Sequence, residues 1–243
     1  MTKKTVKPYE DSGDKKTQVG RMFDNIAGKY DLLNRMLSLG VDQIWRRNVT
    51  RRLKDLKPQR VLDVATGTAD LAIMIQEKLS CQEVIGVDIS QKMLDVGHKK
   101  IERKGLEGHV RLEWGDSENL QFPDNSFDAA TVAFGVRNFG DLQLGIQEIY
   151  RILKPGAKLV VLEFSRPRLP VFKQLYDFYF STILPNVGRW TSKDPKAYRY
   201  LYESVRAFPD YERFIDVLED NGFSQTNFLP QTLGICCIYE GIK

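Results

Sequence analysis

Short apolar runs alternate with amphipathic segments over most of this chain. Five of the runs predict buried strands, over Arg60–Val64, Glu83–Asp88, His109–Trp114, Phe127–Phe134 and Ala157–Phe164. Between them, apolar residues at three- to four-residue spacing predict helices over Leu71–Lys78, Lys92–Lys104 and Leu142–Leu153. Strands that alternate with helices in this way predict a parallel, doubly wound α/β sheet.

The end of the chain departs from this alternation. An aromatic stretch, Phe172–Trp190, and a helix near Asp210–Asp220 follow the fifth strand. Two strand-like runs come last, Gly222–Leu229 and Gly234–Tyr239, separated by a short turn that contains Pro230. So short a connection predicts an antiparallel pair, and hence a mostly parallel, seven-stranded sheet with an antiparallel C-terminal strand.

The segment before the first strand has a helical pattern. Apolar residues from Val19 to Lys57 recur mostly at three- to four-residue spacing, which predicts two or three helices that could cover a substrate cleft. Residues 1–18 lack periodic apolar positions and read as a flexible tail. We therefore expect a single domain over residues 19–243.

Length and composition fit this organisation. A chain of 243 residues with 42% hydrophobic residues suits one α/β domain and excludes global disorder. The sequence contains neither an apolar run near the roughly 20 residues of a membrane-spanning helix nor a signal peptide, so we expect a cytoplasmic protein. Its cysteines, Cys81, Cys236 and Cys237, lack the spacing and histidine partners of a zinc site, and we expect no metal.

Positive charge is concentrated near the N-terminus. The first 60 residues hold 15 Lys and Arg against 7 Asp and Glu, although the net charge is only +4. Between Asp42 and Arg60, basic residues surround an apolar stripe at helical spacing, namely Arg46, Arg47, Arg51, Arg52, Lys54 and Lys57. This pattern fits either a peripheral contact with the anionic inner face of a membrane or a solvated helix face.

The strongest chemical signal is the turn after the first strand. Ala65, Gly67 and Ala69 stand where a dinucleotide fingerprint has glycines, so two Cβ atoms lie where a pyrophosphate needs close approach. Asp63 and Asp70 add negative charge that would repel phosphates. S-adenosylmethionine (SAM), with its amine and sulfonium, fits this turn better than NAD does.

Acidic residues at the next two strand ends extend this site. Asp88 lies about 20 residues beyond Gly67, where a carboxylate accepts hydrogen bonds from ribose hydroxyls. Asp116 and Ser117 follow the third strand and suit the adenine amino group. Each alone could be a cap or turn residue, but together they predict a nucleoside site.

Two further motifs resemble a known family. The segments Phe23–Asn34 and Leu37–Gly40, with Trp45, resemble the N-terminal signature of the menaquinone/ubiquinone biosynthesis C-methyltransferases. A second signature spans Tyr150–Ser165, and Phe-Gly-Val-Arg-Asn at 134–138 lies between the two. The turn at Ala65 is poorer in glycine than in many members.

The resemblance implies a Rossmann-like class I SAM-dependent methyltransferase with an N-terminal helical cap. It implies methyl transfer from SAM to a ring carbon of 2-demethylmenaquinol, with Thr68, Asp88, Asp116 and Ser117 at cofactor-binding positions. Asp42 stands where many members carry histidine, three residues before Trp45.

Candidate catalytic residues follow from the chemistry of ring methylation. A ring carbon attacks a sulfonium methyl once a quinol hydroxyl has lost its proton. Arg137, just after the fourth strand, could stabilise that phenolate or hold the water that accepts its proton, and a structural ion pair is the alternative. Asn138 could orient the quinol oxygen. Tyr30 is a further candidate on the cap. Glu163 is a base, a cap of its strand or the partner of an arginine.

The aromatic stretch offers an apolar wall for an isoprenoid tail, or else plain core. Its members are Phe172, Leu175, Tyr176, Phe178, Tyr179, Ile183 and Leu184. We expect a prenylated quinol as partner and, if the chain oligomerises, a homodimer.

Other function classes are weaker. Methylation of a benzoquinol for ubiquinone, or of another phenol, is the nearest alternative. A nucleic-acid binder or RNA methyltransferase is disfavoured because the chain lacks an Asn-Pro-Pro-Tyr-type motif and a reactive cysteine pair. We therefore expect no nucleic acid partner. A non-enzymatic NAD-binding role is disfavoured by the turn chemistry.

Overall fold

The computed structural model describes residues 6–9, 11–178 and 195–243. Within these residues the core is a seven-stranded sheet in the order β3-β2-β1-β4-β5-β7-β6. The strands are β1 (Arg60–Val64), β2 (Glu83–Asp88), β3 (Val110–Trp114), β4 (Phe127–Ala133), β5 (Leu153–Phe164), β6 (Ser224–Gln231) and β7 (Cys236–Ile242). Strands β1 to β5 pair in parallel, whereas β7 is antiparallel to both β5 and β6. The predicted α/β topology is confirmed, with β6 and β7 two residues later than expected.

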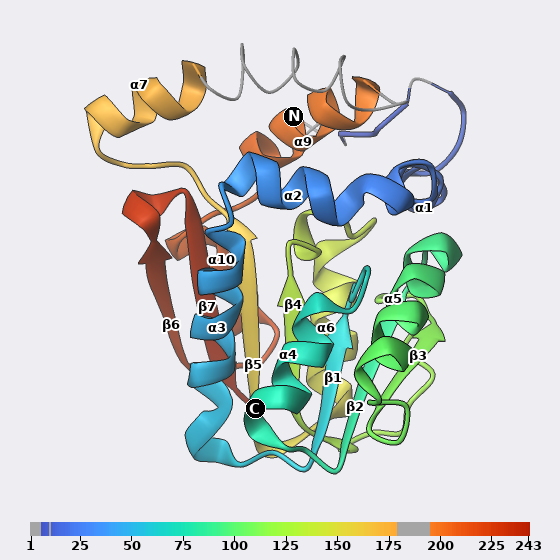
Figure 1. Ribbon diagram of the computed structural model, residues 1–243. Coiled ribbons are helices and arrows are strands. Elements are labelled where there is room, and N and C mark those ends of the chain that lie inside the picture. Colours follow the sequence, from blue (N-terminus) through green and yellow to red (C-terminus); the bar gives the residue numbers. More distant parts are fainter. Residues whose placement is uncertain (1–5, 10, 179–194) are drawn as a thin grey trace.

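Helices cover both faces of the sheet (Figure 1). One face carries α3 (Asp42–Leu53), α4 (Asp70–Leu79) and α5 (Gln91–Lys104), and the other carries α6 (Leu142–Ile152) and α10 (Glu212–Asp220). Leu53 and Ile75 pack into the first core, and Ile149 and Phe214 into the second, all fully buried. The central strands are therefore buried on both faces, which is why they read as continuous apolar runs.

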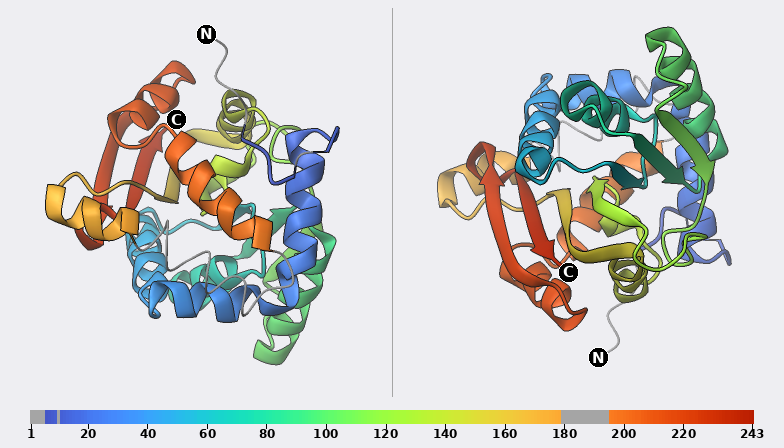
Figure 2. Two further views of the ribbon diagram at one scale, coloured as in Figure 1. Left: turned by 90° about the horizontal axis from the view of Figure 1, so that it is seen from above. Right: turned by 90° about the horizontal axis from the view of Figure 1, so that it is seen from below.

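Further helices form a cap over the carboxyl ends of the parallel strands (Figures 1 and 2). They are α1 (Lys15–Ile26), α2 (Tyr30–Ser38), α7 (Pro170–Phe178) and α9 (Pro195–Ala207). Helix α1 begins before the expected end of the tail at residue 18, because the Asp14 side chain accepts a hydrogen bond from the Thr17 backbone N–H and caps it. Gln18 and Val19 are buried.

Strand register brings the chemical residues together beneath this cap. Val64, the last residue of β1, pairs with Val87 on one side and Val132 on the other. The turn after β1 therefore lies between the ends of β2 and β4, at the edge where ligands of open α/β sheets bind.

Candidate active site

The turn after β1 is folded tightly against the end of β2. Ala65, Gly67 and Ala69 all have positive φ, between 53° and 66°. The Asp88 carboxylate accepts hydrogen bonds from the backbone N–H groups of Gly67 (2.8 Å) and Ser90 (2.9 Å). One acidic side chain thus holds two strand ends in place.

A small pocket of about 60 Å³ opens beside this turn. Its polar wall comes from the ends of β2 and β3, and its members are Asp88, Asp116, Ser117 and Glu118. Asp88, Asp116 and Ser117 thus lie together, as the sequence predicts. We call this space the donor pocket.

The residues of the donor pocket fit SAM. Three carboxylates suit a ligand that carries an amine, a sulfonium and ribose hydroxyls, and they would repel a pyrophosphate. Gly135 lets the loop after β4 press against the turn, because a Cβ there would lie 2.6 Å from the Ala65 Cβ. The Asn138 Oδ1, at the pocket wall, is buried and lacks a hydrogen-bond partner among the described residues. An acceptor atom there suits a ligand with N–H or O–H donors.

SAM affinity is expected to fall as the pH drops through about 6. Burial raises the pKa of Asp88 to about 6, although the hydrogen bonds from Ser90 and Gly67 oppose the shift. The protonated carboxyl loses acceptor strength toward ribose hydroxyls, so binding weakens at low pH. Because the pKa is raised, protonation favours the folded state, and weaker binding is not expected to come from unfolding. Calorimetric titration of SAM between pH 5 and pH 8 checks this, and an Asp88→Asn variant should have a flatter profile.

Asp63 and Thr68, which the sequence assigns to cofactor binding, are not among the residues that line the donor pocket. The Asp63 carboxylate is buried and accepts hydrogen bonds from the hydroxyls of Thr66 and Thr131, both at 2.6 Å. The Thr68 hydroxyl donates to Asp31 on α2 (2.6 Å) and accepts from Lys100 on α5 (2.9 Å). Asp63 therefore links the turn to β4 through its two hydrogen bonds. Thr68 links the turn to helix α2 of the cap.

Two lysines of α1 contact residues at the donor pocket, and no pattern in the sequence indicates their role. Lys15 Nζ donates to the backbone oxygens of Arg137 (3.0 Å) and Phe139 (2.6 Å). Lys16 Nζ forms ion pairs with Asp116 (2.6 Å) and Glu118 (2.9 Å). Both lie within the segment read as a tail, and only the folded cap brings them to the site.

Replacement of Lys16 is expected to speed the exchange of SAM. A typical ligand pocket exceeds about 300 Å³, so the donor pocket must widen when SAM enters, and Lys16 ties its wall together. We expect Lys16→Met to raise the SAM dissociation rate about two- to tenfold, the effect of two partly exposed ion pairs. Stopped-flow fluorescence measures this rate, with the exposed Lys99→Met as control. An unchanged rate would contradict a closing role.

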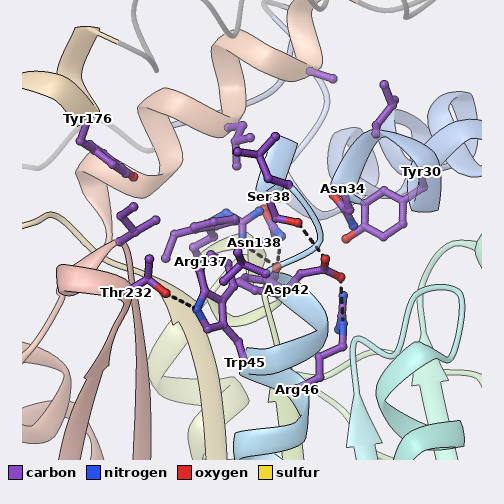
Figure 3. Close-up of a pocket in the computed structure, with 18 of the residues that line it drawn as sticks. Tyr30, Asn34, Ser38, Asp42, Trp45, Arg46, Arg137, Asn138, Tyr176 and Thr232 are labelled. Atoms are coloured by element: carbon purple, nitrogen blue, oxygen red, sulfur yellow. Dashed lines mark hydrogen bonds and ion pairs between the residues drawn. The ribbon is translucent and has the colours of Figure 1, made fainter. Parts of the chain in front are cut away.

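A larger, mostly apolar pocket of about 400 Å³ lies between the cap and the end of the sheet (Figure 3). It has the volume of a site for an organic molecule. It shares Phe23, Tyr30, Phe134 and Asn138 with the donor pocket, so the two spaces meet at these residues. We call it the acceptor pocket.

Arg137 and Glu163 form a buried ion pair at the wall of the acceptor pocket. Arg137 Nη1 lies 2.6 Å from Glu163 Oε1, and the Glu163 side chain is fully buried. Burial raises the pKa of Glu163, whereas the charge of Arg137 lowers it. The Arg137 Nε is buried without a hydrogen-bond partner among the described residues. Of the three roles open to Glu163, which are base, strand cap and arginine partner, the structure supports that of arginine partner.

Tyr30 lies on α2 beside Asn34, and both residues line the acceptor pocket (Figure 3). Burial raises the pKa of its phenol, and the charges of Arg46 and Arg137 oppose this shift. The phenol therefore lies within the fields of two cations. A substrate hydroxyl bound nearby would experience the same fields.

The aromatic wall falls partly outside the described residues. Phe172 and Tyr176 line the acceptor pocket. Tyr179, Ile183 and Leu184 lie beyond residue 178 and are outside the described ranges. Tyr200, on α9, lines the same pocket, and its hydroxyl is buried without a hydrogen-bond partner among the described residues.

Comparisons with known proteins identify the family of the chain. The profile of the ubiE/COQ5 methyltransferase family matches residues 11–243. A demethylmenaquinone methyltransferase of Bacteroides fragilis is 45% identical over 98% of this chain and 97% of its own length. A ubiquinone/menaquinone biosynthesis C-methyltransferase UbiE of Geotalea daltonii is 42% identical over 95% of this chain and 98% of its own length.

Solved structures support the fold. A SAM-dependent methyltransferase of Thermotoga maritima, described as a possible histamine N-methyltransferase, superposes with a TM-score of 0.63 at 20% identity. The similarity covers 92% of this chain and 98% of that protein. At this identity the likeness concerns the fold, which is the class I methyltransferase architecture.

Proposed function

The chain belongs to the ubiE/COQ5 methyltransferase family, and from this premise we propose that it transfers a methyl group from SAM to a ring carbon of 2-demethylmenaquinol, giving menaquinol. One observation carries the proposal. A pocket lined by carboxylates meets a larger apolar pocket at Tyr30, Phe134 and Asn138. A cationic methyl donor and a prenylated ring thereby come into contact, with the reacting atoms at the junction.

The donor pocket would hold SAM through Asp88, Asp116 and Ser117. Bound SAM supplies an electrophilic methyl group on a sulfonium. Asp88 accepts from the ribose hydroxyls, and Asp116 with Ser117 faces the adenine. Lys16 closes the pocket by its ion pairs with Asp116 and Glu118, which keeps water from the reacting centre.

Arg137 and Asn138 activate the acceptor. The hydroxyl next to the reacting ring carbon binds at the junction, where Asn138 orients it and Arg137 stabilises the phenolate. Glu163 holds the guanidinium in that orientation through the 2.6 Å ion pair. Tyr30, on helix α2 of the cap, places a further hydroxyl at the junction of the two pockets. Overall, the ring carbon gains a methyl group and loses its hydrogen as a proton, with S-adenosylhomocysteine as second product.

We propose further that the single domain predicted over residues 19–243, extended at its start to Lys15 by the first turn of α1, carries the activity. We propose that it meets its prenylated substrate in the cytoplasm, at the inner face of the membrane. No helix in the described ranges is long and apolar enough to cross a bilayer. Leu39, Phe172 and Leu233 are exposed large apolar residues that also line the acceptor pocket, and Arg47 and Arg51 are exposed on α3. Exposed apolar residues at the pocket entrance with arginines nearby suit contact with an anionic lipid surface. A homodimer remains our expectation for any oligomer.

The proposal is tested with methyl-labelled SAM and two reduced short-chain acceptors, demethylmenaquinol and the demethylated benzoquinol precursor of ubiquinol. Label in the naphthoquinol alone would support a menaquinone enzyme. Label in both would indicate a dual role, such as the name of the Geotalea relative describes. Label in neither, with SAM binding intact, would overturn the quinol assignment.

A further inference from the structure

Arg46 is a buried cation to which the proposed chemistry gives no role. It was grouped by sequence with the basic surface of α3, but it is only 5% exposed and lines the acceptor pocket. Helical geometry accounts for this, because Arg46 directly follows the buried Trp45 and precedes the buried Val49 by three positions. The Nε of the Arg46 guanidinium is buried without a hydrogen-bond partner among the described residues.

The nearest acidic residue does not satisfy this guanidinium. Arg46 Nε lies 3.7 Å from the Asp42 carboxylate, beyond hydrogen-bond distance. That carboxylate is already used by other donors, since it accepts from the Ser38 hydroxyl (2.7 Å) and the Gln43 amide (3.2 Å). Asp42 therefore balances the charge of Arg46 but leaves its N–H donors available. Buried donors without acceptors are costly, and a ligand oxygen would satisfy them.

Arg46 and Arg137 approach the acceptor pocket from different elements. Phe134 and Phe164 form a tilted ring pair with centroids 4.6 Å apart. The guanidinium of Arg46 lies 5.4 Å from the Phe134 centroid, and that of Arg137 lies 5.5 Å from the Phe164 centroid. The two cations thus contact different members of one aromatic pair, and both fields reach Tyr30. Arg46 does not line the donor pocket, whereas Asn138 lines both.

We propose that Arg46 donates hydrogen bonds to a second oxygen of the acceptor, para to the hydroxyl held by Arg137 and Asn138. This inference rests on the proposed function and specifies its substrate class as a para-diol, not a simple phenol. With an oxygen held at each end, the ring cannot rotate in its plane. The carbon next to the first oxygen then faces the donor pocket. Asp42 acts as a positioning residue for Arg46.

The test compares two acceptors that differ only in the second oxygen. One is a short-chain 2-prenylnaphthalene-1,4-diol. The other is the matching 3-prenyl-1-naphthol, which keeps the hydroxyl next to the reacting carbon and lacks its para partner. We expect the unmodified enzyme to prefer the diol in kcat/KM by about tenfold or more, the effect of one hydrogen bond to a charged group.

Arg46→Met should lower kcat/KM for the diol by about 10- to 100-fold, mainly through KM, and leave the monophenol within about twofold. Arg46→Lys should restore part of the preference, and Arg103→Met, on the exposed side of α5, should behave as the unmodified enzyme. The double variant Arg46→Met/Asp42→Asn leaves no unpaired buried carboxylate and should lose the preference in the same way. SAM affinity verifies that each variant is folded.

Equal losses on both acceptors, or a preference that survives in the folded variants, would overturn the role of Arg46 while leaving the methyltransferase assignment intact. If the unmodified enzyme methylated neither acceptor, the proposed function would fail, and this inference with it.

Discussion

Arg137→Met is expected to lower kcat by about 10²- to 10⁴-fold, the range for loss of a positioned charge that stabilises a reacting oxygen. The Arg137 guanidinium lines the acceptor pocket and is held by Glu163 and by the Phe134 carbonyl, each at 2.6 Å. Loss of its charge makes the quinol hydroxyl harder to ionise. SAM affinity should change little, because Arg137 does not line the donor pocket. Single-turnover rates with reduced acceptor measure the effect.

Stability must be separated from catalysis in this variant. Removal of Arg137 leaves the fully buried Glu163 without its partner, which costs about 3 to 5 kcal/mol. The double variant Arg137→Met/Glu163→Gln removes that uncompensated charge, so its melting temperature should recover while its activity stays low. A double variant that regained activity would show that Arg137 serves the fold only.

Asp88→Asn is expected to raise the Kd of SAM by about 10- to 100-fold, since a hydrogen bond to a charged group is worth about 1.5 to 3 kcal/mol. Asparagine keeps the size of the side chain, but its amide offers one acceptor oxygen where the carboxylate offers two. In the native chain both carboxylate oxygens accept backbone N–H groups at the donor pocket. The amide would therefore lose an acceptor for the turn, for the ribose, or for both.

Isothermal titration measures this change, and Asp95→Asn, exposed on α5, is the control. Retention of normal affinity by Asp88→Asn would remove Asp88 from the cofactor site. Asp63→Asn offers a further contrast, because the Asp63 carboxylate accepts hydrogen bonds from the hydroxyls of Thr66 and Thr131. This variant is expected to lower the stability of the fold more than the affinity for SAM.

The sheet could be predicted from the sequence because its central strands are buried on both faces. Val61, Val84 and Ala129 are fully buried, and such strands form apolar runs that end at polar turns. The cap was harder. Asp14 caps α1 through a side-chain hydrogen bond, but the surrounding residues lack the apolar periodicity that would place a helix before Val19.

The donor side of the site followed from the sequence because parallel strands end at one edge. Asp88 is the last residue of β2, and Asp116 and Ser117 lie within three residues of the end of β3, so topology alone brings them together. Asp63 and Thr68 are close in sequence to the same turn. Whether they contact the cofactor depends on the direction of their side chains, which cannot be predicted from their spacing in the sequence. The role of Arg46 depends on which face of α3 packs against the sheet. Because the neighbouring residues of α3 are also basic, the sequence does not distinguish the buried Arg46 from the exposed arginines.

The position of the transferred methyl group tests the central claim most directly. The enzyme would be supplied with SAM labelled with ¹³C in its methyl group and with reduced short-chain demethylmenaquinol, and the product examined by NMR. We predict a single labelled methyl on the aromatic carbon beside the prenyl chain. Label in a methoxy group would show that the bound quinol presents its oxygen to the donor, and would contradict the arrangement of Arg137, Asn138 and the two pockets described above.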